Sequence, residues 1–487
     1  MGSQLKALPD EFVERYSQFI PDFDEFTRAM FSPPKRTLRI NTLKAGREQA
    51  LEWLRDLMPV RLPWWELAFE VKHAEGIGKR LDHFIGLYYL QDASSMVPAL
   101  VLGPRPGEVV LDLAAAPGSK TTQMAAMMEN TGLLIANDSS SQRIRGLIGN
   151  VDRAGCLNVA VCRTDGNLLS RRLAGSCDRV LVDAPCTCEG TIRRSGQALD
   201  WWSVEAGRQL SRLQKGLAVA GFRALKPGGT MVYSTCTIAP EENEGVVSYL
   251  LDRFPEAEVL PVELPGFRMR DALAEWKGKR FPVPVNRCRR ILPQDNDSEA
   301  FFVALIRKAE GGVDDNGYQR EEVRPRHVEG KPGTVPGRGD PAAIRDSPGF
   351  PLKQVKELRE RFGIPAEVFE RLGVELGQGA VFVATPEVME LAAVKPMRKG
   401  MRLVRVFPHS VKPTTWAMQV LGRYAARNCI DVTDAQAVGL IGGEQLEVEA
   451  DAEDGFVLIR CRGLVVGVGL YRRPVLKSQI PRHRPVE

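Results

Sequence analysis

At 487 residues the chain is too long for a single ordinary hydrophobic core, so two to four domains are expected. Hydrophobic residues make up 44% of the chain and charged residues 26%, which is the composition of a soluble globular protein. The net charge of +5 is only mildly basic, so it permits nucleic-acid binding without indicating it.

Cysteine usage and hydropathy exclude the secreted and membrane-embedded classes of protein. The nine cysteines are scattered and several lie in apolar runs, which does not fit a disulfide framework. Residues 1–9 lack the long apolar core of a signal peptide, and no apolar run approaches the roughly 20 residues of a membrane span. We therefore expect a cytoplasmic protein with reduced thiols and no membrane contact.

The first 86 residues predict a small α/β unit that binds RNA. Apolar side chains recur at helical spacing between residues 4 and 31, with Pro21 as a break, and residues 48–57 form another helical segment. Residues 37–42 and 67–71 alternate like short strands. Residues 88–95 are expected to enter a helix that continues toward residue 102.

A mostly parallel α/β sheet is expected between residues 87 and 308, the catalytic domain. Strand-like apolar runs alternate there with helical segments, among them residues 140–154 and 204–224, which is typical of a sheet with helices on both faces. The expected strands are residues 109–113, 133–137, 159–162, 180–183, 230–234 and 301–306.

The composition changes after residue 308. Residues 309–349 are rich in Gly, Pro, Arg and Asp and nearly lack large apolar side chains, so they are predicted to be a linker. Residues 350–487 regain a globular composition, and they contain two β segments, 455–459 and 464–471, before a basic tail. We expect a carboxyl-terminal extension with its own core.

A turn of small residues follows the first strand of the predicted sheet. It runs from Asp112 through Leu113, Ala114, Ala115, Ala116, Pro117, Gly118 and Ser119 to Lys120, which opens a helix. Small side chains let a ligand approach the backbone, and the helix start offers free N–H groups. The turn lacks the glycines of a phosphate-binding loop or a dinucleotide fingerprint, and it is of the kind that holds an adenosyl cofactor. A tight turn without a ligand is the alternative.

Acidic residues end three further strands. Asp138 lies about 20 positions after the turn, where dinucleotide folds bind the ribose hydroxyls. Asp165 closes the next strand and is placed for the adenine amino group, and Asp183 closes the one after. A single acidic residue at a strand end is usually a turn former or a helix cap, but three in succession indicate a cofactor site.

Two cysteines lie just beyond strand ends. Cys186 follows the strand that ends at Asp183, and Cys236 follows the strand at residues 230–234. Because the carboxyl ends of strands line the ligand crevice of an open α/β sheet, both thiols should face one site. A thiolate can add to an electron-poor carbon and later leave. Together with a nucleoside cofactor, these thiols indicate alkylation of a carbon atom.

Residues 112–121, 183–194 and 226–244 together carry a family resemblance. In that order they resemble the Sun-type family of RNA 5-methylcytosine methyltransferases, over residues 37–308. The carboxyl-terminal extension is similar to that of the bacterial rRNA methyltransferase branch, with a PUA-like RNA-binding end. The resemblance implies a Rossmann-like, S-adenosylmethionine-dependent RNA cytosine-C5 methyltransferase that acts on small-subunit rRNA, with tRNA as the alternative substrate.

The resemblance also implies roles for individual residues. Cys236 would be the nucleophile, Cys186 the thiol that helps to release the product, and Asp183 the group that holds the cytosine ring. The implied contacts of S-adenosylmethionine are residues 114–120, Asp138, Arg143, Asp165 and Asp183. Other matching positions near cofactor or RNA are Arg39, Asn41, Gln91, Asp92, Lys120, Asn243 and Arg290.

The chain departs from the family pattern at four positions. Ala114 stands where family members usually have Cys, and Ser119, Cys188 and Ala300 stand where Gly is usual. Ser119 bears on the backbone geometry at the methionine end of the cofactor. None of these changes removes a catalytic group.

Three other interpretations account less well for the same residues. A DNA cytosine methyltransferase would use Cys186 as nucleophile, but Cys236 would then be unexplained and no large DNA-recognition insert follows. A zinc site from Cys186, Cys188 and Cys236 lacks a nearby His or second Cys pair, so no metal is expected. A non-catalytic ribosome-assembly factor would not need both thiols. Glu241 and Glu242 could serve as a base or a helix cap. Loss of the extension is expected to weaken RNA binding more than chemistry.

Overall fold

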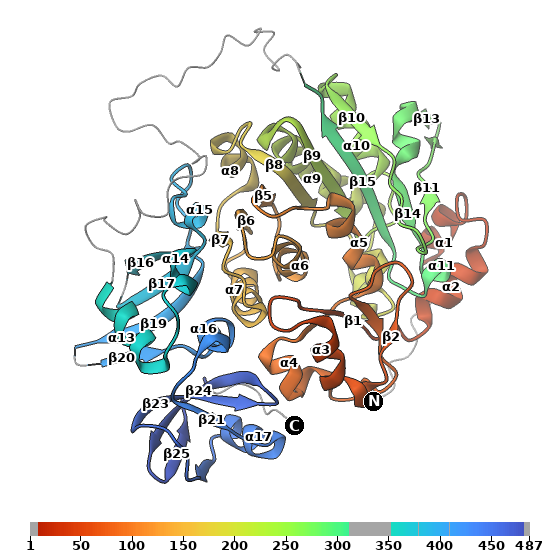
Figure 1. Ribbon diagram of the computed structural model, residues 1–487. Helices are drawn as coiled ribbons and strands as arrows, with labels where there is room; N and C mark the ends of the chain where they lie inside the picture. Colours follow the sequence, from red (N-terminus) through yellow and green to blue (C-terminus); the bar gives the residue numbers. More distant parts are fainter. Residues whose placement is uncertain (1–7, 311–351, 378, 409, 482–487) are drawn as a thin grey trace, which may run out of the picture.

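The computed structural model describes residues 8–310, 352–377, 379–408 and 410–481 (Figure 1). The predicted linker lies outside these residues from position 311 onward. Six strands form the centre of the largest sheet: β5 (Val109–Asp112), β6 (Leu133–Asn137), β7 (Val159–Cys162), β8 (Cys177–Asp183), β9 (Leu225–Thr235) and β15 (Phe301–Lys308). Every residue of β5, β6 and β7 is buried, because the sheet is covered on both faces.

The central strands lie in the order β15-β9-β8-β5-β6-β7. All neighbours in this series pair in parallel except β15, which pairs antiparallel with β9. The chain runs outward from β5 through β6 to β7 and then returns to β8 on the other side of β5. Such a reversal opens a crevice at the carboxyl ends of the strands, where ligands bind in open α/β sheets. The structure therefore confirms the predicted α/β sheet and its six strands.

Helices cover the two faces of the sheet in separate layers. The first layer is α5 (Ala93–Leu102), α6 (Ser119–Met127) and α7 (Arg143–Ala154), and the second is α8 (Gly166–Arg172), α9 (Val204–Ala224) and α10 (Glu244–Arg253). Adjacent residues of β5 point to opposite faces of the sheet and pack against different helix layers. Val110 packs in a core with residues of α5, α6 and α7, whereas Leu111 packs in a core with residues of α8, α9 and α10.

Short elements extend the sheet beyond β15, form a separate two-stranded sheet and occupy the loops after β8. The strands are β10 (Ala257–Leu260), β11 (Arg270–Asp271), β12 (Glu275–Trp276), β13 (Lys279–Arg280) and β14 (Arg289–Ile291), and a short helix is α11 (Pro293–Asn296). Single helical turns are η3 (Glu189–Thr191), η4 (Gly196–Asp200) and η5 (Val283–Arg287). The pairings of β10, β11, β14 and β15 are antiparallel. None of the strands β10 to β14 was predicted, because each is only two to four residues long.

The amino-terminal unit is a helix pair followed by a small antiparallel sheet. Its elements are α1 (Asp10–Tyr16), α2 (Phe23–Phe31), β1 (Thr37–Ile40), α3 (Arg47–Trp53), η1 (Arg55–Leu57), β2 (Val60–Arg61), β3 (Ala68–Glu70), η2 (Ile77–Lys79), α4 (Leu81–Ile85) and β4 (Tyr88–Leu90). The sheet order is β2-β3-β1-β4. The expectation for residues 88–95 was wrong in part, because Tyr88–Leu90 is a strand paired with β1 and the helix begins only at Ala93.

The carboxyl-terminal extension contains two further sheets. The first part has α13 (Leu352–Phe362), α14 (Glu367–Glu370), β16 (Gly373–Gly377), β17 (Ala380–Ala384), α15 (Pro386–Met389), β18 (Arg398–Lys399), β19 (Met401–Phe407), β20 (Ser410–Pro413), α16 (Thr415–Leu421) and η6 (Gly422–Tyr424). The second part has β21 (Cys429–Asp431), α17 (Asp434–Gly442), β22 (Gln445–Glu447), β23 (Gly455–Cys461), β24 (Leu464–Arg472) and β25 (Val475–Ser478). The sheet orders are β16-β17-β19-β20 and β21-β23-β24-β25-β22.

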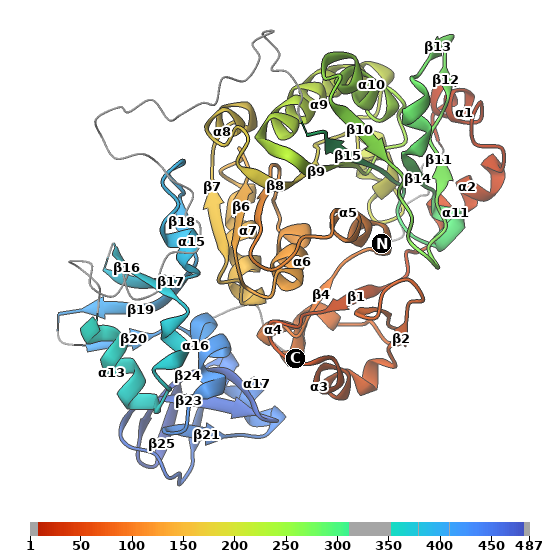
Figure 2. The same ribbon diagram turned by 45° about the horizontal axis from the view of Figure 1, so that its top comes forward.

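The extension packs directly against both other parts of the chain (Figures 1 and 2). Strand β18 adds to the edge of the central sheet by pairing with β7. Helix α17 contacts α4, and one hydrophobic core contains residues of the amino-terminal sheet together with residues of the last sheet. In the described part of the chain, no helix is long and apolar enough to cross a membrane.

Candidate active site

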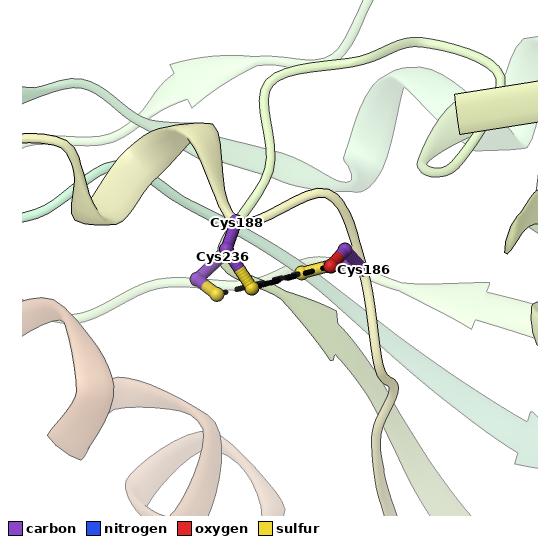
Figure 3. Close-up of side chains that lie close together, drawn as sticks. All are labelled: Cys186, Cys188 and Cys236. Atoms are coloured by element: carbon purple, nitrogen blue, oxygen red, sulfur yellow. Dashed lines mark hydrogen bonds between the residues drawn. The ribbon is translucent and has the colours of Figure 1, made fainter. Parts of the chain in front are cut away.

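Three thiols converge beyond the ends of β8 and β9 (Figure 3). The two strands are parallel neighbours with Asp183 level with Ser234, so the loops that follow them start side by side. Cys186 Sγ lies 3.4 Å from Cys236 Sγ and 3.8 Å from Cys188 Sγ. The structure therefore brings the two predicted thiols together, and it adds Cys188 as a third.

The proton affinities of these thiols are linked, because each is a hydrogen-bond partner of another. Hydrogen bonds from Cys186 and Cys236 lower the pKa of Cys188, and the Arg194 guanidinium acts in the same direction. The pKa of Cys186 is raised, because its hydrogen bonds with Cys188 and Cys236 and its burial disfavour the thiolate. The cluster therefore favours one shared negative charge over three independent thiols.

Gly190 joins the two thiol loops through its backbone. Its N–H donates to the carbonyl of Cys236 at 2.9 Å, and its carbonyl accepts from the N–H of Ala300 at 3.3 Å. A Cβ atom at Gly190 would lie 2.2 Å from the Ala300 carbonyl oxygen and 2.8 Å from that of Cys236. Both are backbone atoms, so a side chain here would displace the loop that carries Cys236.

Gly190→Ala is therefore expected to destabilise the protein by about 1–3 kcal/mol, as overpacking of a dense site does. It is also expected to lower the methyl transfer that the family resemblance implies, because Cys236 moves. Thermal unfolding and a methylation assay check both effects. Gly196→Ala is the matched control, since a Cβ at Gly196 meets nothing within 4 Å. Equal melting temperatures for the two variants would contradict the prediction.

Two buried carboxylates lie under the thiol loops. Glu242 accepts from the N–H of Thr187 at 3.1 Å, and its other oxygen accepts from the Thr187 hydroxyl at 2.5 Å. Glu189 accepts from the Tyr16 hydroxyl at 2.6 Å and from the Trp202 indole N–H at 2.8 Å. Burial and the nearby Glu189 charge raise the pKa of Glu242 to about 8. Thr187 Oγ1 also lies 2.7 Å from Glu189 Oε2, so these contacts join Thr187, the neighbour of Cys186, to helix α1 through Glu189.

Glu241 and Glu242 separate in a way that the sequence does not predict. The Glu242 carboxylate accepts hydrogen bonds from Thr187 and from the Gln214 amide, which donates at 2.6 Å. It is therefore occupied by these partners and does not cap a helix. Glu241 accepts from the Trp276 indole N–H at 3.1 Å and pairs with Arg15. Both acidic residues therefore hold the surrounding elements in place.

Asp183 is fixed by polar partners on both oxygens. The Lys120 ammonium lies 2.8 Å from its Oδ2 and also donates to Ser95 Oγ at 3.1 Å. The Ser234 hydroxyl donates to its Oδ1 at 2.8 Å. Lys120 lies in the first turn of α6, where the small-residue turn ends, so this ion pair joins the turn to the thiol loops. The side chain of Asp183 is 28% exposed, which leaves it open to a ligand in the crevice.

The turn at residues 114–120 combines features that fit a bound ligand. Gly118 has φ of +105°, and a Cβ there would lie 2.9 Å from Leu147 Cδ1, so this position favours glycine. Asp112 Oδ1 is buried and has no hydrogen-bond partner in the described part of the chain, whereas Thr121 donates to Oδ2 at 2.7 Å. Burial raises the pKa of Asp112 to about 7. A ligand with a polar group would satisfy this free oxygen.

Asp138 lies beside the same turn. Its Oδ2 accepts from the N–H of Ala116 at 3.2 Å, and its Oδ1 accepts from the N–H of Ser140 at 2.9 Å. Arg143 pairs with Asp138 at 3.3 Å and donates to the carbonyl of Ala116. The structure thus brings the predicted residues Ala116, Asp138 and Arg143 into one contact group.

Asp165 is a helix cap in this structure. Its Oδ1 accepts from the N–H groups of Asn167 and Leu168 at 2.9 and 3.2 Å, which starts α8. The helix-cap alternative for an acidic residue at a strand end therefore holds for Oδ1 of Asp165. Asp165 lies three residues after the end of β7, at the edge of the sheet where Asp138 and Asp183 also lie.

Other positions implied by the resemblance hold the framework around the site. Buried Arg39 donates to Gln91 Oε1 at 2.9 Å and to the carbonyl of Ser119 at 3.1 Å, which links β1 to the turn. Arg290 makes two hydrogen bonds with Glu244, at 2.7 and 2.6 Å, and is only 4% exposed. The Asn243 side chain contacts both neighbours of Cys236. Its Oδ1 accepts from the Thr235 hydroxyl, and its Nδ2 donates to the Thr237 carbonyl.

The remaining matching positions are structural too. Asn41 donates to the carbonyls of Gly86 and Ala154, at 2.9 and 2.8 Å. Asp92 caps α5 by accepting from the N–H of Ser94 at 2.9 Å. It also accepts from the N–H of Glu299 at 3.2 Å. These contacts place the start of α5 beside the segment that leads into β15.

The order of the central strands, with the thiols beyond the ends of β8 and β9, defines a Rossmann-like methyltransferase fold. A crystal structure of a methyltransferase homologue from Pyrococcus horikoshii matches with a TM-score of 0.55 and 34% identity, covering 61% of this chain and 94% of that one. Family models for the 16S rRNA methyltransferase RsmB/F, the RsmF N-terminal domain and the RsmF PUA domain match residues 99–307, 8–93 and 427–484.

Two curated relatives extend this result. The ribosomal RNA small subunit methyltransferase F of Aeromonas salmonicida is 32% identical over 98% of this chain and 96% of its own length. The tRNA (cytosine(49)-C(5))-methyltransferase of Pyrococcus abyssi is 42% identical over 63% of this chain and 98% of its own length. The chain therefore belongs to the RsmB/F family of methyltransferases. The family resemblance, the PUA-like end and the enzyme class of RNA cytosine-C5 methyltransferase are confirmed.

Proposed function

We propose that the protein methylates carbon 5 of a cytosine in small-subunit rRNA in the cytoplasm, with Cys236 as nucleophile and S-adenosylmethionine as methyl donor. The 3.4 Å distance between the sulfurs of Cys186 and Cys236, beside Asp183, carries this proposal. The choice of rRNA is supported by the relative from Aeromonas salmonicida, which aligns with the extension as well as with the catalytic part. A tRNA substrate is the second candidate, favoured by the more identical but shorter relative from Pyrococcus abyssi.

The chemistry begins with activation of the ring. Carbon 5 of cytosine is a poor nucleophile, so the Cys236 thiolate first forms a bond to carbon 6 and moves electron density to carbon 5 and nitrogen 3. A proton shared between the Asp183 carboxyl group and ring nitrogen 3 stabilises this charge, and Lys120 and Ser234 hold the carboxyl group in position. When bound, S-adenosylmethionine supplies the methyl group that carbon 5 receives.

Release requires the second thiol. After methylation, carbon 5 still carries its proton, and this proton must leave before the bond from carbon 6 to Cys236 can break. A base takes the proton from carbon 5, and the electron pair left behind re-forms the ring double bond as the bond from carbon 6 to sulfur breaks and Cys236 leaves as a thiolate. Cys186 lies in contact with Cys236 and assists this step. The target base has to leave its stack to reach these groups, at a cost of a few kcal/mol in paired RNA.

The cofactor is assigned to the turn at residues 114–120 with Asp138, Arg143, Asp165 and Asp183. The small side chains, the free oxygen of Asp112 and the carboxylate of Asp138 fit the polar ends of an adenosyl sulfonium compound. In the same proposal, residues 1–86 and 350–487 hold RNA around a catalytic domain at residues 87–308. Residues 309–349 connect the catalytic domain to the carboxyl-terminal extension.

Asp138→Ala is expected to raise the Kd for S-adenosylmethionine by about 10- to 100-fold, because hydrogen bonds to charged groups contribute roughly 1.5–3 kcal/mol. Isothermal titration calorimetry measures the change. Asp271→Ala is the matched control, since Asp271 is an exposed aspartate paired with Arg289 and lies away from the turn. An unchanged Kd for the Asp138 variant would remove Asp138 from the cofactor site.

The proposed function is tested with methyl-labelled S-adenosylmethionine and three RNA samples: free small-subunit rRNA, small ribosomal subunits and total tRNA. Label is expected in rRNA and is expected to be recovered as 5-methylcytidine after digestion to nucleosides. Label in tRNA alone would establish the second candidate. Label in a base other than cytosine, or no transfer to any sample, would refute the proposed reaction.

A further inference from the structure

Cys188 has no part in the reaction proposed above, yet its thiol points into the same cluster (Figure 3). Its backbone adopts φ of +62°, a left-handed conformation that non-glycine residues rarely take. Its sulfur lies 3.2 Å from the carbonyl of Cys186 and 3.8 Å from the Cys186 sulfur. A strained backbone that holds a third thiol against two reactive ones needs an explanation of its own.

No metal is expected from the sequence, but the three sulfurs lie at distances close to those of a tetrahedral metal site. The ligand atoms of Cys186, Cys188 and Cys236 all lie within 4.8 Å of one another, and two of the distances are 3.4 and 3.8 Å. Zinc binds thiolates at about 2.3 Å, so tetrahedral geometry separates two bound sulfurs by about 3.8 Å. Within the described residues, no His, Asp or Glu joins the group, which leaves the fourth position to water.

The loops that carry the thiols are already held in place. Gly190 N–H bonds to the Cys236 carbonyl at 2.9 Å, and the N–H of Thr191 donates to the Cys188 carbonyl at 2.9 Å. The Thr187 N–H is anchored on Glu242. A preformed arrangement reduces the ordering cost of binding, because few side-chain rotations remain to be fixed.

We propose that Cys186, Cys188 and Cys236 form a site for a thiophilic divalent cation of the Zn²⁺ type, and that its occupation inhibits methyl transfer. Thiolate ligands select such ions over Mg²⁺ and Ca²⁺. Binding forms a tris-thiolate complex of one Zn²⁺ and releases the protons that the three sulfurs still carry. The affinity therefore increases with pH. No oxidation is involved.

The inhibitory consequence rests on the proposed function, whereas the binding site does not. If Cys236 adds to cytosine and Cys186 assists release, a metal bound to both sulfurs removes the nucleophile and its partner at once. Cys188 then supplies the third ligand, because two thiolates alone bind zinc much more weakly.

Cys188→Gly tests the site, since glycine adopts the left-handed conformation without strain and removes only the third thiol. The full-length protein is titrated with Zn²⁺ against a chromophoric chelator, and with Cd²⁺ to follow the thiolate-to-metal absorption band. The wild type is expected to bind one ion, and the variant to lose at least about 100-fold in affinity, because a lost ligand costs more than the roughly 10- to 100-fold that a lost outer-shell partner costs. Cys188→Ser serves as a second variant.

Methyl transfer is assayed in parallel at increasing Zn²⁺, with Mg²⁺ as the control ion and with reductant present throughout. The wild type is expected to be inhibited at the concentration that fills the site and to recover on addition of a chelator. The Cys188→Gly protein is expected to stay active at that concentration. If activity recovers only with a stronger reductant and not with a chelator, the inhibition comes from a disulfide and the metal site is refuted.

The outcomes separate the two proposals. Equal Zn²⁺ affinity of the wild type and both variants would overturn the site. Cys188-dependent binding without inhibition would overturn the inhibition and also the assignment of Cys236 and Cys186 as reacting thiols. Inhibition at the same concentration in the wild type and in Cys188→Gly would show that the metal acts elsewhere.

Discussion

Replacing Cys236 with alanine is expected to abolish methyl transfer, whereas replacing Cys186 with alanine is expected to leave protein covalently attached to RNA. Removing a covalent nucleophile costs at least about 10³-fold in rate, because the remaining groups cannot activate carbon 5 of cytosine by themselves. Without Cys186 the bond from Cys236 to carbon 6 still forms, but the elimination that breaks it slows. The intermediate therefore accumulates.

Denaturing gels of each variant after incubation with RNA and S-adenosylmethionine measure this difference. An adduct is expected for Cys186→Ala, none for Cys236→Ala, and none for the double variant. Cys188→Gly is the matched control, since it removes a thiol of the same cluster that has no step in the proposed reaction. The reverse pattern, with an adduct in Cys236→Ala, would make Cys186 the nucleophile. No adduct from either variant, with no methyl transfer by the wild type, would favour a non-catalytic RNA-binding role.

The sequence predicts the convergence of the thiols for a physical reason. Each thiol follows a β-type apolar run, and the carboxyl ends of parallel neighbours in an open sheet meet at one edge. Helix α9 is predicted with its observed bounds, because Ser203 caps its start and a regular apolar stripe runs to Ala224. These features depend on local pattern and on a general rule of topology, so no knowledge of distant contacts is needed.

The charged residues that support the site are not predictable in the same way. Arg193 and Arg290 each stand beside another arginine in the sequence, a pattern typical of a basic surface, but Arg193 pairs with Asp297 and Arg290 with Glu244 inside the protein. Glu189 is likewise buried, with partners that lie 173 and 13 positions away in the sequence. Burial of a charge is decided by the partner that the fold supplies, and that partner is invisible in the local sequence.

The role of the extension also depends on long-range contacts. Loss of the extension was expected to weaken RNA binding more than chemistry, as for an independent module. In the structure Ala384, Val388, Leu391 and Val394 pack in the core of the catalytic sheet. Lys44 donates to Gln419 Oε1 at 2.9 Å across another part of the junction. The extension therefore stabilises the parts of the chain that precede it.

A protein truncated after residue 345 is accordingly expected to unfold at least about 10 °C below the full chain, in addition to any loss of RNA affinity. Each buried Val or Leu side chain contributes about 1.5–3 kcal/mol, and 1 kcal/mol shifts the melting temperature of a protein part of this size by about 2–4 °C. Truncation also removes the pairing of β18 with β7 and exposes Phe84, whose ring lies 5.4 Å from that of Trp416.

Calorimetry of the truncated and full-length proteins measures this effect, and cofactor affinity shows whether the catalytic part still folds. Arg398→Ala isolates one junction contact within the full chain, because Arg398 pairs with Asp152 of α7 through both carboxylate oxygens and both side chains are largely buried. Arg460→Ala is its control, since the Arg460–Asp431 pair lies on the surface of the last sheet, where ion pairs contribute little. An unchanged melting temperature on truncation, with only RNA affinity lost, would make the extension a separable binding module despite its shared cores. A lower melting temperature in Arg398→Ala than in Arg460→Ala would place part of the stability at this junction, where the edge of the catalytic sheet meets the extension.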